Sequence, residues 1–447
     1  MYPLGVPLPD SPHAVSVSLP KWADVVGYEE GESRVIDAMQ LGYPRFVYHP
    51  FVEKLFADCA KKFAGADEFC HAYPSRKACE LSTEYCGVGR VEEFSAGIWA
   101  AVFPRGSEEQ AKEFWQHAGV GICSRFAEHR ESKTQDAKAV DFIKDKLANL
   151  SGADVEDIYL FPSGMAAIYT AHRLPETRNP RPETIQLGFP YVDTLKVQQK
   201  FGTAEFVAFD DHEKLAQTEA DAVFTEYPLN PLLQQVDFAK VRAAIGTTPL
   251  IVDDTLCAWQ GFNTLDVADI AVTSLTKFFS GIGDVMVGCL ILNKKSPHYA
   301  KFKAKLDGIY EDLLYADDAK TLAKNCTDFD ERIEKILENA GRITNFLTTH
   351  SPQSTIHNFN GMISAVFPTR EQAVNFYDNL HVMKGPSLGM EHTLACPYTL
   401  LAHYNELDWA ESVGVSAHLV HISVGAEDYA ELEDVFAKAL SSLSSYV

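Results

Sequence analysis

Residues 274–288, SLTKFFSGIGDVMVG, place one lysine among two hydroxyl side chains and two phenylalanines, ahead of a glycine-rich turn. The apolar run IAVTSL (270–275) overlaps the start of this stretch, and DVMVGCLILN (284–293) overlaps its end. A lysine rarely lies beside so much apolar bulk without a function. The connection at 276–283 is too short for a crossover helix, so we expect the second strand to run antiparallel to the first.

Further apolar runs precede this stretch and predict the rest of one sheet. They are IYLF (158–161), TIQLGF (184–189), AEFVAF (204–209), AVFTEY (222–227) and LIVDDT (250–255). Helical stretches such as TLKVQQKF (194–201) and VDFAKVRAAI (236–245) separate most of them. Continuous apolar strands that alternate with helices indicate a mostly parallel sheet covered on both faces, so the fold class is α/β. A helical stripe over 317–349 is expected to lead into a smaller domain.

Two stretches repeat one plan. GIWAAVFPRGSEEQAKEFW (97–115) and GMISAVFPTREQAVNFY (361–377) each predict a short strand that ends at a proline, followed by a helix. We expect both units in one sheet, so that the N-terminal segment and the C-terminal third build one small domain. The expected divisions are an N-terminal arm and segment (1–95), a strand–helix unit with an inter-subunit loop (96–130), a large domain (131–330) and a small domain (331–447). Residues 1–50, rich in Pro and Gly, predict an extended arm that wraps a partner subunit or runs over its own surface.

Composition restricts the class of function. The chain has 447 residues and a formal net charge of −23, which argues against nucleic acid and anionic membrane as partners. Nine cysteines, an odd number without a CxxC pair, favour a reducing compartment, and no stretch predicts a signal peptide or a membrane helix. We therefore expect a cytoplasmic protein. The spacing of Cys70, His71, Cys79 and Cys86 is not typical of zinc, so no metal site is predicted.

Ligands bind at the carboxyl ends of strands in open α/β sheets, and polar or aromatic residues follow several of the predicted strands. Ser163 and Gly164 stand where a helix begins, which suits either a phosphate or a plain helix cap. Tyr191 either covers a flat ring or packs in the core. Asn230, between two prolines, either reaches a ligand or makes a turn.

The last two strands end in an acid and in the lysine. Asp253 follows LIVD and either pairs with a protonated ring nitrogen or caps the next turn. Lys277 either acts as a neutral nucleophilic amine or extends its ammonium group to water. Taken in order, these residues are the set that pyridoxal 5′-phosphate (PLP) requires: phosphate held, ring stacked, ring nitrogen paired with an acid, aldehyde bound to lysine.

At these residues the chain resembles the Cys/Met-metabolism family of PLP enzymes, and within it the fungal cystathionine γ-synthase-like group. The resemblance covers nearly the whole chain. It includes HAVSVSLPKW (13–22), VGYEEGE (26–32), GYPRF (42–46), AKEFWQHAG (111–119), PSGMAAI (162–168), EYPLNP (226–231), VDDT (252–255), SLTKFFSG (274–281), PSLG (386–389), TLACPYTLLAHYNELDWA (393–410) and ISVGAED (422–428). It implies fold type I, aspartate aminotransferase-like, with a mostly parallel seven-stranded sheet in a large domain and a smaller α+β domain.

The resemblance also implies roles. Lys277 matches the Schiff-base lysine, which shuttles protons, and Tyr191 matches the tyrosine that stacks on the cofactor ring. These two are the catalytic residues that the resemblance implies. The other implied cofactor contacts are Asp253 at the ring nitrogen, Asn230 near the ring oxygen, and Ser163, Gly164, Met165, Ser274 and Thr276 at the phosphate. Arg125 matches an arginine lent to the neighbouring subunit's phosphate, which implies a homodimer or homotetramer with shared sites, and Ser387 matches a substrate-contacting serine.

Two positions depart from the family pattern. A tyrosine of the phosphate motif is replaced by Cys123 in Cys123-Ser124-Arg125. His421 stands where the family has the arginine that holds the substrate carboxylate. Arginine offers a bidentate fork, whereas histidine offers one donor and can be neutral at pH 7. We interpret His421 as a sign of an altered substrate, against the alternative that it is simply tolerated.

Three hypotheses for function follow. The first is γ-replacement on an activated homoserine ester such as O-acetyl-L-homoserine, through a vinylglycine-type species that takes up a sulfur or carbon nucleophile. The second is elimination by a cystathionine-type β- or γ-lyase. The third is a PLP-fold protein without catalysis.

Overall fold

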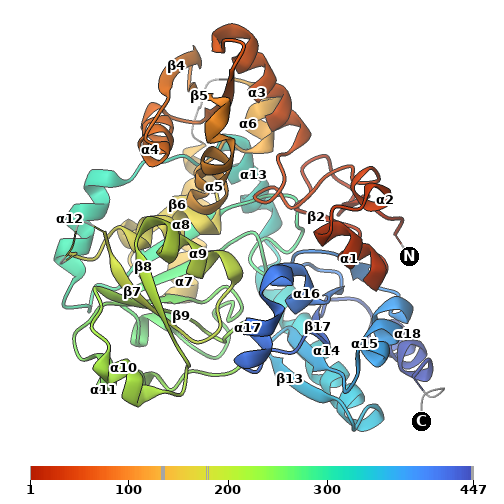
Figure 1. The fold of residues 1–447 in the computed structure, drawn as a ribbon. Coiled ribbons are helices and arrows are strands. Elements are labelled where there is room, and N and C mark those ends of the chain that lie inside the picture. Colours follow the sequence, from red (N-terminus) through yellow and green to blue (C-terminus); the bar gives the residue numbers. More distant parts are fainter. Residues whose placement is uncertain (1, 132–135, 178, 180, 444–447) are drawn as a thin grey trace.

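The computed structural model describes residues 2–131, 136–177, 179 and 181–443. Its central sheet has seven strands in the order β6-β12-β11-β10-β9-β7-β8 (Figure 1). The strands are β6 (Ile158–Phe161), β7 (Glu183–Leu187), β8 (Thr203–Val207), β9 (Ala222–Glu226), β10 (Leu250–Asp253), β11 (Ile270–Ser274) and β12 (Gly288–Leu292). This confirms the predicted mostly parallel sheet.

Strand β12 is the antiparallel member of the sheet. It pairs antiparallel with β11, where Ser274 lies opposite Gly288, and antiparallel with β6 on its other side. Residues 275–287, which contain Lys277, separate β11 from β12 and form turns with no crossover helix, so the chain reverses and β12 returns beside β11. The predicted reversal is confirmed.

Helices cover both faces of this sheet. On one face, Ile168 of α8 (Gly164–His172) packs in a cluster with Phe224, Val272 and Leu290. On the other, Ile143 of α7 (Ala137–Ser151) belongs to a second cluster with strand residues of β6, β11 and β12. The large region also holds α9 (Val192–Phe201), α10 (His212–Gln217), α11 (Phe238–Ile245), α12 (Tyr299–Ile309), α13 (Ala316–Asn325) and the short 3₁₀ turns Val155–Asp157 and Thr264–Asp266.

A second sheet of five strands is built by the C-terminal part of the chain. Its order is β13-β14-β17-β16-β15, with β13 (Thr355–Phe359), β14 (Met362–Val366), β15 (Met383–Lys384), β16 (Leu394–Cys396) and β17 (Leu419–Ser423). Helices α14 (Phe329–His350), α15 (Arg370–Asn379) and α18 (Tyr429–Ser441) accompany it, with the short α16 (Tyr398–Ala402), α17 (Leu407–Ser412) and the 3₁₀ turn Tyr404–Glu406. The stripe expected over 317–349 is helical, but it is divided between α13 and α14.

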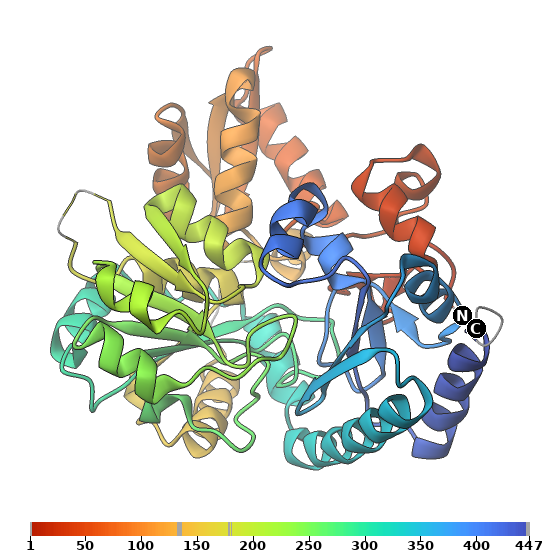
Figure 2. The same cartoon turned by 60° about the horizontal axis from the view of Figure 1, so that its bottom comes forward.

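The N-terminal segment lies against this C-terminal part of its own chain (Figure 2). Leu19 and Trp22 share one apolar cluster with Phe376 and Phe436. The segment contains the strand pair β1 (Pro7–Leu8) and β2 (Ser16–Val17) and the helices α1 (Trp22–Glu29) and α2 (Ser33–Ile36). The prediction of a purely extended arm is therefore wrong, because the apolar side chains after residue 18 form a helix with a buried face.

Residues 50–129 form a third unit. Three antiparallel strands in the order β3-β5-β4, β3 (Glu68–Tyr73), β4 (Arg90–Ser95) and β5 (Ile98–Pro104), are accompanied by α3 (Pro50–Phe63), α4 (Arg76–Cys86), the 3₁₀ turn Arg105–Ser107, α5 (Glu108–Ala118) and α6 (Ser124–His129). Among the described residues, no helix is both long and apolar enough to cross a lipid bilayer.

The repeated sequence plan gives two similar units in two different sheets. Residues 97–115 form β5 and α5, and residues 361–377 form β14 and α15, so the strand–helix prediction is confirmed in both places. The expectation of a shared sheet is wrong. Strand β5 pairs with its sequence neighbours β3 and β4, whereas β14 lies between β13 and β17. Strand β5 pairs on both sides with strands of its own N-terminal unit, β3 and β4, and therefore does not join the C-terminal sheet.

Candidate active site

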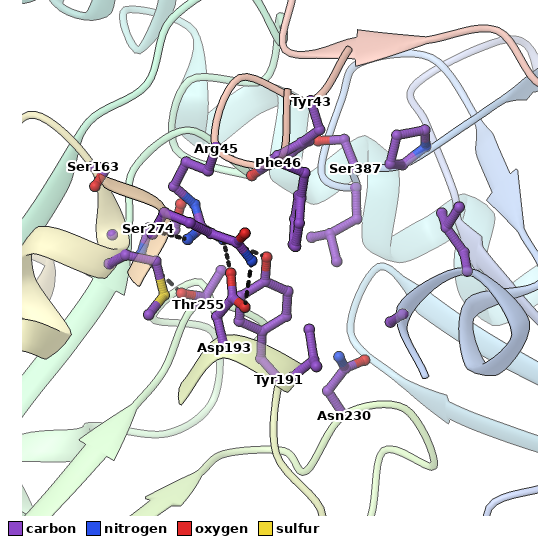
Figure 3. Close-up of a pocket in the computed structure, with 18 of the residues that line it drawn as sticks. Tyr43, Arg45, Phe46, Ser163, Tyr191, Asp193, Asn230, Thr255, Ser274 and Ser387 are labelled. Atoms are coloured by element: carbon purple, nitrogen blue, oxygen red, sulfur yellow. Dashed lines mark hydrogen bonds and ion pairs between the residues drawn. The ribbon is translucent and has the colours of Figure 1, made fainter. Parts of the chain in front are cut away.

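A cavity of about 930 Å³ lies at the carboxyl ends of the central strands. Four parts of the chain line this cavity, part of which is drawn in Figure 3. Helix α5 contributes Lys112, Gln116 and His117. Loops after the central strands contribute Ser163, Gly164, Met165, Tyr191, Asn230, Asp253, Ser274, Thr276 and Lys277; the N-terminal segment contributes Tyr43, Arg45 and Phe46; the C-terminal part contributes Ser387, Cys396, Tyr398 and His421. Of the predicted site residues, only Arg125 is not among the lining side chains.

Lys277 follows β11 and is held between two hydroxyl groups. Its Nζ lies 3.0 Å from Tyr43 Oη and 3.0 Å from Ser387 Oγ. The amine also lies 4.8 Å from the centre of the Tyr43 ring. Ser387 has a φ of 147°, a backbone conformation that favours glycine, so the surrounding structure fixes its hydroxyl at some energetic cost. Sequence reasoning found Lys277 and Ser387 but missed Tyr43.

The start of α8 provides a site for an anion. Ser163 caps the helix, since its Oγ accepts from the Ala166 N–H at 3.1 Å and donates to the Gly119 carbonyl at 2.9 Å. A Cβ placed on Gly164 would come within 2.9 Å of the Ser274 Cβ, so glycine lets the helix terminus approach that serine closely. Free N–H groups at a helix N-terminus beside a hydroxyl suit a phosphate.

The hydroxyl of Thr276, unlike that of Ser274, is hydrogen-bonded to the backbone of Val287. Its Oγ1 donates to the Val287 carbonyl at 3.3 Å and accepts from the Val287 N–H at 3.1 Å. The side chain therefore ties the turn after β11 to the approach of β12. This contact leaves Thr276 beside the cavity, with one oxygen lone pair for a further donor.

An acidic group faces the cavity from the end of β10. Asp253 Oδ1 accepts from the Thr255 N–H at 2.9 Å and from Thr255 Oγ1 at 2.6 Å, and Thr255 Oγ1 accepts from the Ser274 N–H at 2.8 Å. Burial raises the pKa of Asp253. A cationic partner would favour the ionised form, and a protonated pyridine nitrogen is such a partner. Thr255 was not predicted, although it belongs to the VDDT stretch.

Glu226, at the end of β9, lies close to the predicted residues Tyr191 and Asn230. Its Oε1 accepts the Tyr191 N–H at 2.5 Å, which places the tyrosine relative to β9. Burial, with Asp253 nearby, raises the pKa of Glu226 well above its usual value. Asn230 follows β9 in the same loop, and its side-chain oxygen is buried without a hydrogen-bond partner among the described residues. An unpaired buried oxygen of this kind calls for a ligand donor.

Tyr191 is held by a buried ion pair that sequence reasoning did not find. Arg45 Nη2 donates to Tyr191 Oη at 2.6 Å and lies 2.8 Å from Asp193 Oδ2, while Arg45 Nη1 donates to the Gln116 carbonyl at 3.1 Å. The contacts of Arg45 with Tyr191 and Asp193 are drawn in Figure 3. Burial raises the pKa of Tyr191 well above its usual value, even with the guanidinium beside it. The signal in the sequence was GYPRF (42–46), whose tyrosine and arginine both reach the cavity.

His421 lies on β17 with its ring 5.3 Å from the Tyr398 ring. Burial lowers the pKa of His421 to about 3, so its imidazole is neutral at physiological pH. Its Nε2 has no partner among the described side and main chains. The cation that the resemblance implies at this position is therefore replaced by a neutral hydrogen-bonding group.

Arg125 of α6 lies outside the cavity of its own chain. Its guanidinium is buried, 2.8 Å from Asp318 Oδ1 and 3.7 Å from Asp284 Oδ2. Cys123 caps the same helix, with its sulfur accepting the Phe126 N–H at 3.4 Å. The role of Arg125 at a neighbouring subunit's phosphate stays a prediction.

Most of the chain matches a known protein family. The model of the Cys/Met metabolism PLP-dependent enzymes matches residues 133–441. The chain belongs to this family. It is 31% identical to a cystathionine γ-synthase-like enzyme of Amanita muscaria, over 98% of this chain and 96% of the relative. It is 30% identical to the cystathionine γ-synthase of Neurospora crassa, over 98% of each chain.

A solved structure carries the same fold. Yeast cystathionine γ-lyase is 25% identical and superposes with a TM-score of 0.60, covering 68% of this chain and 85% of that one. The chain is therefore a fold type I enzyme of the Cys/Met-metabolism family, and pyridoxal 5′-phosphate is its cofactor. The predicted fold, enzyme class and cofactor are confirmed. The donor set fits that cofactor, with an anion site at α8, an acid at Asp253 and an amine at Lys277.

Proposed function

We propose that this enzyme catalyses γ-replacement on an activated homoserine ester of the O-acetyl-L-homoserine kind, with a sulfur or carbon nucleophile. The observation that carries the proposal is similarity along nearly the entire chain to cystathionine γ-synthase-like enzymes. The cavity supports it, since the amine, the acid and the stacking tyrosine surround one space.

In this reaction the bound cofactor supplies an aldehyde for the lysine and a ring that withdraws electrons from the substrate. Lys277 takes the proton from the α-carbon of the substrate, and a second proton leaves the β-carbon. The carboxylate leaves from the γ-carbon with its bonding electrons, and the nucleophile forms a new bond to that carbon. With the cofactor bound, Asp253 would hold the proton on its ring nitrogen and Tyr191 would stack on its ring.

His421 distinguishes this enzyme from its arginine-bearing relatives in the proposal. A neutral imidazole offers the substrate carboxylate one hydrogen bond in place of a charged fork. Such a site favours a substrate whose remaining groups contribute much of the binding. We propose a role in specialised metabolism on this basis, with a substrate other than that of housekeeping cystathionine synthesis.

The test is a substrate panel. The cofactor-loaded enzyme is incubated with O-acetyl-L-homoserine together with one nucleophile at a time: sulfide, cysteine, an amine or an enolisable carbonyl compound. The products are identified by mass. A product that joins the four-carbon amino-acid unit to one nucleophile supports the proposal. Release of only a 2-oxo acid and ammonia with every nucleophile would refute it.

Elimination is the second candidate, since the solved yeast γ-lyase shares the fold at 25% identity. A lyase and a synthase use the same lysine, acid and tyrosine, so the site geometry supports both. L-Cystathionine supplied alone separates them: a lyase releases cysteine or homocysteine with ammonia and a 2-oxo acid at a rate comparable to the replacement reaction.

We further propose a cytoplasmic homodimer or homotetramer with shared sites. The resemblance to a family that lends an arginine at the position of Arg125 to the neighbouring subunit supports this assembly. In the isolated chain Arg125 lies beside Asp318 and Asp284, outside its own cavity. Light scattering of the loaded enzyme measures the oligomer. Arg125→Ala should weaken cofactor retention in dialysis, and a fully active monomer would contradict the proposal.

A further inference from the structure

Three residues that line the active-site cavity carry a buried polar atom without a hydrogen bond or an ion pair among the described residues. They are Asn230, Tyr398 and His421, through Oδ1, Oη and Nε2. Tyr398 is 8% exposed and His421 is 3% exposed. A buried polar atom that is left without a partner costs free energy, so each of these atoms indicates an atom of a ligand.

Tyr398 and His421 lie together on the C-terminal part of the chain. Strands β16 and β17 are antiparallel, and Cys396 of β16 lies directly opposite His421 of β17. Tyr398 follows two residues after Cys396 and begins α16. The rings of Tyr398 and His421 are 5.3 Å apart and meet edge to face, at 63°. One small area of the cavity wall therefore presents two polar groups without partners.

This area lies near the reacting amine. Burial raises the pKa of the Cys396 thiol to about 12, and the charge of Lys277 opposes that rise. Lys277 is thus close to the face of the C-terminal sheet on which His421 lies. A second residue of the C-terminal part, Ser387, holds the amine directly, with its Oγ 3.0 Å from Nζ.

Both unpaired groups are neutral hydrogen-bond donors at physiological pH. Burial, with Glu226 and Tyr191 nearby, raises the pKa of Tyr398 well above its usual value, so the phenol keeps its proton. Burial lowers the pKa of His421 to about 3, so its imidazole carries one proton, which an acceptor at Nε2 would hold on that nitrogen. Two adjacent donors suit a group that only accepts, and a carboxylate with its two oxygens is such a group.

The polar groups of the cofactor are matched elsewhere in the cavity. The N-terminus of α8 suits the phosphate, Asp253 the ring nitrogen and Lys277 the aldehyde. These residues follow the central strands, as Asn230 does, whereas Tyr398 and His421 belong to the C-terminal part. The two donors are therefore left for the substrate. An amino-acid substrate carries its carboxylate on the α-carbon, whose proton Lys277 removes, so this carboxylate must bind near the amine.

We infer that Tyr398 is a specificity-determining residue that donates a hydrogen bond from Oη to the substrate carboxylate, beside the hydrogen bond from His421 Nε2. Two neutral donors on neighbouring elements then do together what a guanidinium does as one charged fork. Neither donor supplies a charge, so recognition depends on the placement of both. The inference rests on the proposed function, from which it takes only that the substrate is an amino acid.

The experiment compares two amines that differ only in the carboxylate, L-2-aminobutyrate and propan-1-amine. Each is titrated into the cofactor-loaded enzyme, and binding is followed by the absorbance of the cofactor. Tyr398→Phe removes Oη and keeps the ring against His421. Tyr377→Phe is the matched control, because Tyr377 is a buried phenol of the same part of the chain that donates to the Leu19 carbonyl at 2.7 Å and does not line the cavity.

We expect the wild type to bind L-2-aminobutyrate more tightly than propan-1-amine. Tyr398→Phe should weaken the binding of L-2-aminobutyrate by about tenfold or more, since it loses a hydrogen bond to a charged group. The same variant should change the binding of propan-1-amine by less than about threefold. His421→Leu, which removes the other donor, should show the same selective loss, and Tyr377→Phe should leave both affinities within about twofold.

A Tyr398→Phe enzyme that binds both amines more weakly by the same factor would overturn the inference, because that result describes a structural role. Unchanged binding of L-2-aminobutyrate by this variant would overturn it too, as would a wild type that binds the two amines equally. None of these outcomes bears on γ-replacement, which the product panel tests. Selective loss in an enzyme that only eliminates would refute γ-replacement and support the role of Tyr398.

Discussion

Replacing His421 by arginine tests how the enzyme holds its substrate. His421 lines the cavity on β17, is 3% exposed, and burial lowers its pKa to about 3. It therefore carries no charge at any pH at which the enzyme is assayed. We expect wild-type affinity for an amino acid to show no inflection near pH 6.5 that can be assigned to this imidazole.

The magnitude follows from the number and charge of the donors. A neutral imidazole donates one hydrogen bond to a carboxylate, whereas a guanidinium donates two in a fixed fork. A second charge-assisted hydrogen bond contributes about 1.5 kcal/mol or more. His421→Arg should therefore tighten the binding of L-2-aminobutyrate by about tenfold or more. His421→Gln keeps a neutral donor that does not titrate and should stay within about threefold of the wild type.

The assay is a spectroscopic titration of the loaded enzyme with L-2-aminobutyrate at several pH values from 5.5 to 8.5. Equal or weaker binding by His421→Arg would refute the assignment of this position to the carboxylate. An inflection near pH 6.5 in the wild type that is absent from His421→Gln would refute its neutrality. The product panel repeated with His421→Arg shows whether the position also selects the substrate.

Three further outcomes are expected. Asp253→Asn should lower kcat by about 10²- to 10³-fold, with Asp253→Glu retaining more activity, as measured by initial rates at saturating cofactor. Arg45→Met removes the guanidinium that pairs with the buried carboxylate of Asp193 and leaves that carboxylate with Gln116 Nε2 and the His117 ring. It should destabilise the fold by about 3–5 kcal/mol, seen as a lower urea midpoint that Asp193→Asn partly restores. Burial lowers the pKa of both His71 and His421 to about 3. Because these histidines take up protons in the unfolded chain near pH 6.5 but not in the folded protein, their contribution to stability is complete above that pH and is lost as the pH falls. The free energy of unfolding should decrease by about 2 kcal/mol per histidine at pH 5, and His71→Gln should reduce this loss in urea titrations.

The central sheet and its lysine were predictable because their signals are local. Each strand is a short apolar run followed by its own polar residue, and parallel strands bring those residues to one edge. Lys277, Asp253 and Tyr191 were predicted as site residues in this way, and all three line the cavity. The antiparallel direction of β12 was also predictable, since the glycine-rich stretch before it gave no sign of a crossover helix.

The N-terminal contribution to the site was not predictable, because it depends on contacts between distant parts of the chain. Tyr43 is 234 residues from Lys277, and Arg45 is 146 residues from Tyr191. Neither residue follows a predicted strand. The motif GYPRF was visible, but nothing in its pattern indicated which cavity it would enter. Asp193 lies two residues after Tyr191, and its role as the ion-pair partner of Arg45 depends on that long-range contact.

The repeated strand–helix plan shows the same limit. The sequences at 97–115 and 361–377 predicted the elements correctly and their sheet incorrectly. An amino-acid pattern specifies which face of a strand is buried, but it does not specify which other strands lie beside that strand. For β5 those strands are β3 and β4.

The contact between Tyr43 and Lys277 has a consequence for biosynthesis. Tyr43 leaves the ribosome 234 residues before Lys277. At about 5–20 residues per second, the N-terminal segment waits about 10–50 s before the lysine that it contacts exists. Cofactor capture is thus a late event in the making of this enzyme. The rate at which newly made chains acquire the cofactor should report the docking of the first fifty residues, and chaperone binding in that interval would compete with it.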